Sequence, residues 1–203
     1  MSALELPEDL DNRLVHWRDG IVLQNGAFVP EGWTATHEAA VLMPLFKDEK
    51  GWNLLLTRRT DRVETHKGQV SFPGGARDPG DTDLVQTALR EAWEEVGLRP
   101  EDVQVIGELP PMTLISRFNV TPVAGIIPWP YSFTISLDEV SRVFSIPLDW
   151  LANPANHCMR QHEHEGRFWP VLYYEPYDGE TLWGASAYMT SQLLDLILKT
   201  PAN

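Results

Sequence analysis

The chain has 203 residues, of which 43% are hydrophobic, which is enough for one domain with a sizeable core. Its formal net charge of −13 argues against general nucleic-acid binding, which requires basic patches, so no nucleic-acid partner is expected. A single cysteine, the lack of any apolar run of transmembrane length and an acidic N-terminus without a signal-peptide pattern predict a cytoplasmic protein with no membrane partner.

Hydrophobic periodicity predicts strands and helices along the chain. In chain order, the expected elements are a helix at 7–18, strands at 38–46, 52–59 and 69–72, a helix that ends at Gly97, strands at 103–109, 120–129 and 140–146, a helical turn at 148–151, a strand at 168–174 and a closing helix at 187–199. Residues 20–37 and 152–166 are expected to be irregular. Strands on both sides of a central helix, with a final helix, favour an α/β fold whose mixed sheet is covered on both faces. Residues 1–35 are expected to form an N-terminal helix and irregular extension packed on a domain that spans residues 36–200.

Basic residues lie at the end of the second predicted strand and between it and the third, just before a glycine-rich turn. Taken alone, its charges are typical of a solvated surface, but beside such a turn they suit contact with an anionic substrate. Glycine has no side chain, so the backbone of the turn can approach a ligand closely. The residues expected to bind substrate are Arg58, Arg59, His66, Lys67, Gly74 and Gly75.

The next segment predicts an amphipathic helix with defined ends. Its apolar residues recur at spacings of three and four: Val85, Ala88, Leu89, Ala92 and Val96. The acidic run at 81–83 offers N-caps, and Gly97 is typical of a C-terminal cap. On such a helix Glu91, Glu94 and Glu95 stand at i, i+3 and i+4, so they share one side.

Three carboxylates on one side of a helix form either a solvated surface or a site for a cation. Arg90 lies four residues before Glu94 and is expected to pair with it, which leaves Glu91 and Glu95 to bind a metal ion. Oxygen ligands of this kind suit Mg²⁺ or Mn²⁺. Bound cations would also invert the local field for an anionic substrate.

A second group of potential metal ligands lies near the C-terminus. His157, His162 and His164 occur with Glu163 and Glu165, which raises the alternative of a zinc site. Their spacing matches no strong zinc pattern, and histidines in a loop are usually solvated, so zinc is not expected.

The glycine-rich turn and the glutamate helix together resemble the Nudix box, Gly-x5-Glu-x7-Arg-Glu-U-x-Glu-Glu-x-Gly-U, where U is aliphatic. The second half matches from Arg90 to Leu98. The first half is out of register by one residue: Thr82 stands where counting back from Arg90 places the first Glu, whereas Asp81 fits the spacing from Gly75. The resemblance implies an α/β/α sandwich and hydrolysis of a nucleoside diphosphate linked to another group.

The same resemblance implies roles for the acidic residues. Glu91 and Glu95, with Glu94 nearby, would hold the metal ions, and Arg90 would be one of the catalytic residues. The base that takes a proton from the attacking water is either Glu94 or a residue in a later loop. Glu139, just before the strand at 140–146, is the main later candidate, and Glu163 and Glu165 follow it.

Residues 54–75 are similar to the signature of the coenzyme A diphosphatase branch, Leu-Leu-Thr-x-Arg-Ser/Ala-x3-Arg-x3-Gly-x3-Phe-Pro-Gly-Gly. Two positions depart: Thr60 stands where Ser or Ala is expected, and Glu64 where Arg is expected. Residues 182–187 resemble the Trp-Gly-x-Thr/Ser-Ala stretch that opens the last helix in that branch. The resemblance covers roughly residues 36–198 and implies cleavage of coenzyme A to 3′,5′-ADP and 4′-phosphopantetheine.

Two alternatives stay open. One is a Nudix hydrolase of another substrate, such as ADP-ribose, a dinucleotide or a modified dNTP. The other is a non-catalytic Nudix domain that senses a nucleotide or binds a protein, although its expected mark, loss of the box carboxylates, is absent from this sequence. The expected partner is a small nucleotide similar to coenzyme A. The sequence does not decide the oligomeric state, so a homodimer stays open.

Overall fold

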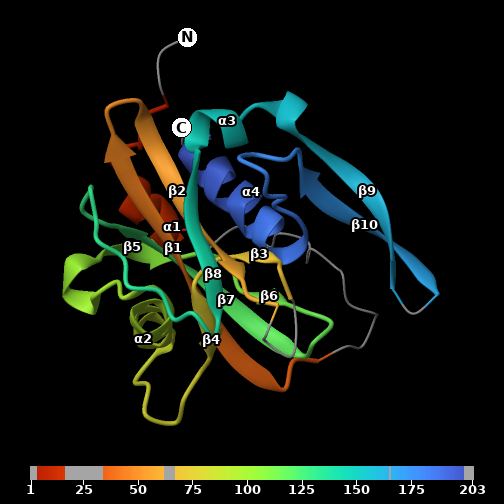
Figure 1. Cartoon of the computed structure of the whole chain (residues 1–203), viewed down its shortest axis with the longest axis horizontal. Helices are drawn as coiled ribbons and strands as arrows, with labels where there is room; N and C mark the ends of the chain where they lie inside the picture. Colours follow the sequence, from red (N-terminus) through yellow and green to blue (C-terminus); the bar gives the residue numbers. More distant parts are fainter. Residues whose placement is uncertain (1–3, 17–33, 62–66, 165, 199–203) are drawn as a thin grey trace.

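The computed structural model describes residues 4–16, 34–61, 67–164 and 166–198 (Figure 1). The helices are α1 (Leu10–His16), α2 (Leu84–Val96), α3 (Leu148–Leu151) and α4 (Gly184–Leu198), with short 3₁₀ turns η2 (Pro100–Asp102) and η3 (Pro154–Asn156). The strands are β1 (His37–Asp48), β2 (Gly51–Arg59), β3 (Val70–Ser71), β4 (Gly74–Ala76), β5 (Gln104–Glu108), β6 (Met112–Thr113), β7 (Phe118–Ile126), β8 (Val140–Pro147), β9 (His157–His164) and β10 (Arg167–Tyr174).

Strand β1 is the centre of a mixed sheet and pairs with three other strands. It runs parallel to β7 from His37 to Leu45 and antiparallel to β2 from Leu45 to Asp48. Its first half instead pairs with β4, where Ala40 lies opposite Gly75. The glycine-rich turn is therefore built into the sheet, at the place where β1 changes partner from β4 to β2.

Both faces of the sheet are buried, because side chains alternate along each strand. Ala40, Leu42 and Phe46 belong to the core cluster that contains the apolar side of α2, and Ala39, Met43 and Leu45 to the cluster that contains residues of α1 and α4. Helices thus cover the two faces of a mixed sheet, which confirms the predicted α/β sandwich.

The N-terminal helix, expected at 7–18, is found as α1 and packs against β5 and α4. Arg13 Nη1 donates to the carbonyl of Leu196 at 3.0 Å, so this helix contacts the last turn of α4. The boundary between residues 35 and 36 stays a prediction. Among the described residues, no helix is both long and apolar enough to cross a membrane.

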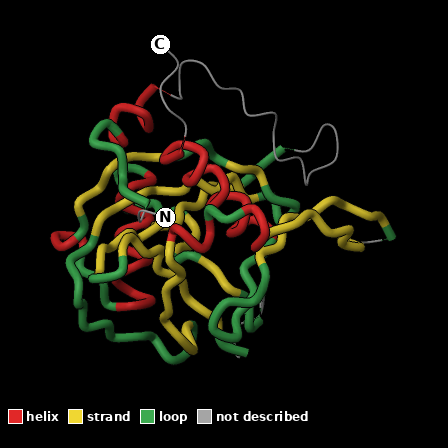
Figure 2. The backbone as a smooth tube through the Cα atoms, turned by 90° about the horizontal axis from the view of Figure 1, so that it is seen from above, coloured by secondary structure: helices red, strands yellow, loops and turns green. Residues whose placement is uncertain are grey.

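The expectation that residues 152–166 are irregular is wrong. Residues His157–His164 form β9, which pairs antiparallel with β10 in a separate two-stranded hairpin. The hairpin projects from the body of the molecule in both views (Figures 1 and 2). Its first strand has the polar sequence HCMRQHEH, so it lacks the alternation by which a half-buried strand is recognised.

Candidate active site

Helix α2 carries the three box glutamates, and local interactions fix both of its ends. Asp83 is the N-cap and accepts a hydrogen bond from the Gln86 N–H at 2.8 Å, while Gly97 ends the helix at φ 70°. Tertiary packing places the glutamates at different depths: Glu95 is 2% exposed, Glu91 is partly buried and Glu94 is exposed. They share one side of the helix, as predicted, but they do not share one environment.

Arg90 lies at the centre of a network that joins α2 to the preceding loop. Its Nε and Nη2 donate to the two carboxylate oxygens of Asp81, each at 3.0 Å, and Nη2 also reaches the carbonyl of Ala76 at 3.0 Å. Its Nη1 donates to Glu91 at 2.6 Å and to Glu94 at 3.2 Å. The predicted pair with Glu94 is present. The expectation that this pairing leaves Glu91 without Arg90 is wrong, because one guanidinium reaches both carboxylates.

Asp81 is the acid of the preceding loop that the structure joins to Arg90. Its buried carboxylate accepts hydrogen bonds from the Asp78 N–H and the Thr87 hydroxyl, both at 2.9 Å, in addition to those from Arg90. These donors, Arg90 first among them, hold the pKa of Asp81 well below its usual range. Thr82, the residue in formal register, bonds to Gln86 instead. The loop thus absorbs the extra residue and brings Asp81 to Arg90.

Glu95 is the most deeply buried of the box acids. Its Oε1 lies 3.7 Å from Arg59 Nη1, and the Gly74 N–H hydrogen-bonds to its carboxylate. Burial raises the pKa of Glu95 to about 8, the attraction of Arg59 opposes the rise, and the charges of Glu139 and Glu91 add to it. A buried carboxylate crowded by other carboxylates is a group that a cation would stabilise.

Gly75 provides the space that Glu91 occupies. A Cβ added at Gly75 would lie 2.6 Å from Glu91 Cδ, whereas one at Gly74 would lie 2.4 Å from the backbone oxygen of Ala40. Burial also raises the pKa of Glu91, although Arg90 opposes the shift. The two glycines therefore serve different purposes: Gly74 allows strand contact, and Gly75 seats a carboxylate.

Gly75→Ala and Gly74→Ala are expected to separate activity from stability. The first should lower hydrolytic activity by about 100-fold, because Glu91 must move by about 1 Å, with little change in melting temperature. The second should lower the free energy of unfolding by about 1–3 kcal/mol, because backbone must shift in β1. Activity assays and thermal melts check both variants, and equal behaviour of the two would contradict these roles.

Glu139 is brought to the box by the segment that crosses α2. The Ser136 N–H donates to the carbonyl of Glu95 at 2.8 Å, and the Glu139 N–H donates back to the Ser136 carbonyl at 3.0 Å. The charge of Glu139 contributes to the raised pKa of both Glu91 and Glu95, so the three carboxylates lie within electrostatic reach. Glu163, a further candidate base, lies on β9 in the projecting hairpin. The side chain of Glu165 falls outside the described residues.

The basic residues expected to contact substrate are not equivalent. Arg59 points to Glu95, and its Nε is buried without a hydrogen-bond partner among the described residues. Arg58 points the other way, with its Nε 3.5 Å from Glu180 Oε2, because side chains alternate along β2. Lys67 is exposed, and His66 lies outside the described residues. Arg59 is therefore the predicted cation that the structure joins to the acids.

An open pocket of about 420 Å³ lies beside the box turn and was not predicted from the sequence. Its lining residues include Ala76, Arg77 and Asp81 from the box loop, with His37 and Phe118 from β1 and β7. The His37 and Phe118 rings lie 5.2 Å apart between centroids, because parallel pairing aligns these two residues. Only that pairing, which the sequence does not reveal, brings them together.

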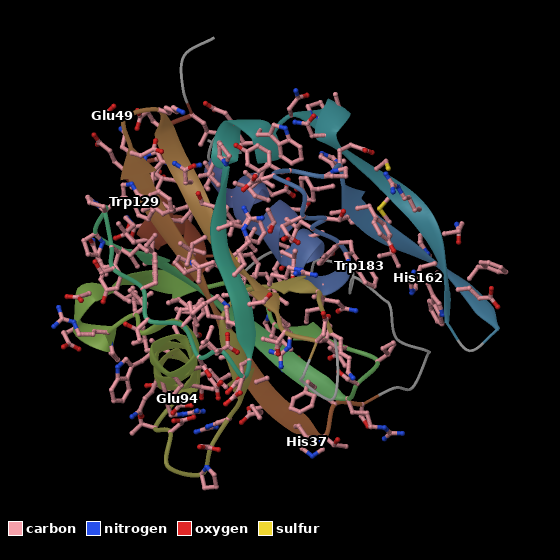
Figure 3. All side chains as sticks on the ribbon, viewed as in Figure 1. His37, Glu49, Glu94, Trp129, His162 and Trp183 are labelled. Carbon is pink, nitrogen blue, oxygen red and sulfur yellow. The ribbon has the colours of Figure 1, made fainter. Side chains whose placement is uncertain are left out.

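His162, one of the histidines considered for zinc, lies away from the box. In Figure 3, His162 is beside Trp183 and far across the molecule from Glu94, and its Nδ1 lies 3.2 Å from the Tyr173 hydroxyl. Within the described ranges, no group of three or more His, Cys, Asp or Glu side chains is arranged to hold a metal ion. This holds for the box as well, where Arg90 binds Glu91 and Glu94 and Arg59 faces Glu95.

Residues 36–165, more than half of the chain, match the NUDIX domain. The chain belongs to the Nudix family. Its sequence is 42% identical over 161 residues to "Uncharacterized Nudix hydrolase NudL" of Enterobacter sp. (strain 638), covering 77% of this chain and 80% of that protein. It is 44% identical over 146 residues to the protein of the same name from Citrobacter koseri, covering 72% and 70%.

The solved structure of RenU, a Nudix hydrolase from M. smegmatis, is similar to this Nudix chain. The two share 25% sequence identity with a TM-score of 0.50, over 59% of this chain and 76% of the other. The predicted Nudix fold is therefore confirmed, and so is the prediction of a hydrolase that acts on a diphosphate bond.

Proposed function

We propose that this Nudix hydrolase cleaves the diphosphate bond of coenzyme A or its acyl derivatives to 3′,5′-ADP and (acyl-)4′-phosphopantetheine. The observation that carries the proposal is the position of segment 54–75, whose described residues lead through β2 and β3 to β4. The guanidinium of Arg59 in this segment faces the carboxylate of Glu95, and Gly75 leaves the space that Glu91 occupies. The stretch that resembles the coenzyme A branch thus supplies an arginine that faces one box acid and a glycine that leaves room for another.

Members of the family generally need divalent cations such as Mg²⁺ or Mn²⁺. The residues present fit such an ion: Glu91 and Glu95 offer hard oxygen ligands, Glu94 lies next to them, and burial, with added repulsion from neighbouring carboxylates, raises the pKa of both Glu91 and Glu95. A cation would compete with Arg90 for Glu91. When bound, it would neutralise charge on the diphosphate and lower the pKa of a coordinated water.

The side chains of the protein supply a base and counter-charges. Glu139 is the favoured base, because it is exposed and lies within electrostatic reach of Glu91 and Glu95. Glu94 is the weaker candidate, because Arg90 already binds it. The Nε of Arg59, which is buried without a hydrogen-bond partner in the part of the chain that the structure describes, suits a phosphate oxygen.

A substrate panel tests the proposal. Coenzyme A, acetyl-coenzyme A, ADP-ribose, a dinucleoside tetraphosphate and a dNTP would be incubated with the protein and Mg²⁺ or Mn²⁺, and the products separated by chromatography. We expect 3′,5′-ADP from both coenzyme A substrates, with a kcat/KM at least about tenfold above that for the others. The Glu95→Gln variant is the matched blank for contaminating hydrolases.

Faster turnover of ADP-ribose, a dinucleotide or a dNTP would replace coenzyme A with that substrate and leave the box assignment in place. Binding of these compounds without hydrolysis of any would contradict the catalytic assignment itself. Glu64, where the branch signature has Arg, falls outside the described residues. Glu64→Arg belongs in the same panel, because an added cation there should favour the substrate with the extra 3′-phosphate.

A further inference from the structure

Thr60 follows the last residue of β2 and is buried, with 7% of its surface exposed. Two of its groups donate to consecutive carbonyls of the segment that ends at Glu139. The Thr60 hydroxyl donates to the carbonyl of Asp138 at 2.8 Å, and the Thr60 N–H donates to the carbonyl of Glu139, also at 2.8 Å. A single residue just beyond β2 thus binds the two consecutive carbonyls of Asp138 and Glu139.

The other end of this segment is bound to α2. The Thr134 N–H donates to the carbonyl of Val96 at 3.0 Å, and the Ser136 N–H to that of Glu95 at 2.8 Å. The segment then turns into β8, where the Val140 N–H donates to the carbonyl of Ser136 at 2.8 Å. The segment 134–139 therefore runs from the end of the metal-binding helix to Thr60, and Glu139 lies at its anchored end.

Repulsion between carboxylates explains why Glu139 needs such an anchor. Glu139 is exposed, and its carboxylate is repelled by the charges of Glu91 and Glu95 whenever these are ionised. An exposed side chain on an unanchored loop would relieve that repulsion by moving into solvent. The hydrogen bonds from buried Thr60 to the carbonyls of Asp138 and Glu139 limit such movement of the backbone.

We infer that Thr60 is a positioning residue: its hydroxyl and amide hold the backbone of Glu139 so that the carboxylate stays at the acid cluster, where the proposed reaction needs a base. The inference rests on the proposed function, in which Glu139 takes the proton from the attacking water. Threonine keeps a hydroxyl donor at this position, as the serine of the branch signature would and its alanine would not.

The matched pair Thr60→Val and Thr60→Ser tests the hydroxyl. Valine keeps the branched shape without the donor, and serine keeps the donor. Thr60→Val is expected to lower kcat by about 10- to 100-fold with KM changed less than about twofold, because a misplaced base affects the chemical step and not substrate binding. Thr60→Ser is expected to stay within about threefold of the unchanged protein.

A double-mutant cycle with Glu139→Gln separates positioning from a general structural role. If Thr60 acts through Glu139, Thr60→Val should cost almost nothing once the base is absent. Equal losses in both backgrounds, or no loss from Thr60→Val alone, would overturn the inference while leaving Glu139 as the base. Full activity of Glu139→Gln would overturn the base assignment and the inference together, although the metal and substrate proposals would stand.

Hydrogen exchange on the metal-free protein gives a readout that does not depend on activity. Thr60→Val should speed amide exchange in residues 136–140, where the Val140 N–H is bonded to Ser136, and leave exchange in β1 and β7 unchanged. Unchanged exchange in 136–140 would overturn the inference even if kcat fell. Should Thr60→Val fail to fold, Thr60→Cys replaces it, because a thiol is a weak donor of similar size.

Discussion

Replacing Glu95 with glutamine is expected to remove nearly all metal-dependent hydrolysis while the protein still folds. Glutamine has the same shape, but it is neutral and cannot act as an anionic oxygen ligand for a hard cation. Loss of this proposed metal ligand, which is only 2% exposed, should lower kcat/KM by at least about 1,000-fold. Glu94→Gln is the matched control, since Glu94 is exposed and pairs with Arg90, and its loss should be much smaller. Full activity of Glu95→Gln would sink the metal-site assignment.

The same substitution should alter how stability depends on pH. The pKa of Glu95 is raised from 4.5 to about 8 in the folded protein, so between these values the folded state holds a proton that the unfolded state has released. Without metal, stability should therefore fall as pH rises from about 4.5 to about 8, and Glu95→Gln should lack this part of the fall. Thermal melts in a chelator from pH 5 to 9 measure it. Added Mg²⁺ should raise the melting temperature at pH 8 in the unchanged protein only.

Removing the Arg90 guanidinium is expected to have the largest effect on stability. Arg90→Met leaves Asp81 buried without its counter-charge, a loss of about 3 kcal/mol and of about 6–12 °C in melting temperature. The substitution also removes the hydrogen bond to the carbonyl of Ala76 and leaves the carboxylates of Glu91 and Glu94 to repel each other. Activity should therefore fall as well. Urea unfolding and thermal melts give the magnitude.

The control for Arg90→Met is the double variant with Asp81→Asn. The second change removes the uncompensated charge, so the double variant should recover part of the lost stability. Asp81→Asn alone should also reduce acid sensitivity, because the lowered pKa of Asp81 contributes stability at neutral pH that is lost as pH falls below about 4. A double variant no more stable than Arg90→Met would show that the buried charge is not the cause.

Much of the fold follows from local patterns in the sequence. The ends of α2 were predicted from an acidic run and Gly97, and both caps are present. The apolar runs of β1 and β2 were read correctly because their side chains are buried on both faces. Strand β9 was missed because it is exposed and its polar residues carry no period of two.

The candidate site was less accessible to sequence reasoning, because it depends on contacts between distant segments. Spacing placed Glu91, Glu94 and Glu95 on one side of a helix, but their burial is decided by β4 and by the segment at 134–139. The role of Asp81 depends on how a loop absorbs one extra residue, which no count along the chain reveals. Thr60 was noted only as a departure from a signature; its contacts with Asp138 and Glu139 span 78 residues or more of sequence.

The change of partner along β1 has a consequence for cooperativity. The ladder between β1 and the box turn continues beyond β4, from Leu42 N–H to Pro73 at 2.8 Å and from Arg77 N–H to Glu38 at 3.0 Å. Opening of the turn would therefore break hydrogen bonds to the central strand of the sheet. We expect local opening of the ligand site to be coupled to loosening of the sheet. Whatever binds the box acids should stabilise the whole domain, and mutations in the core of the sheet should weaken that binding in return.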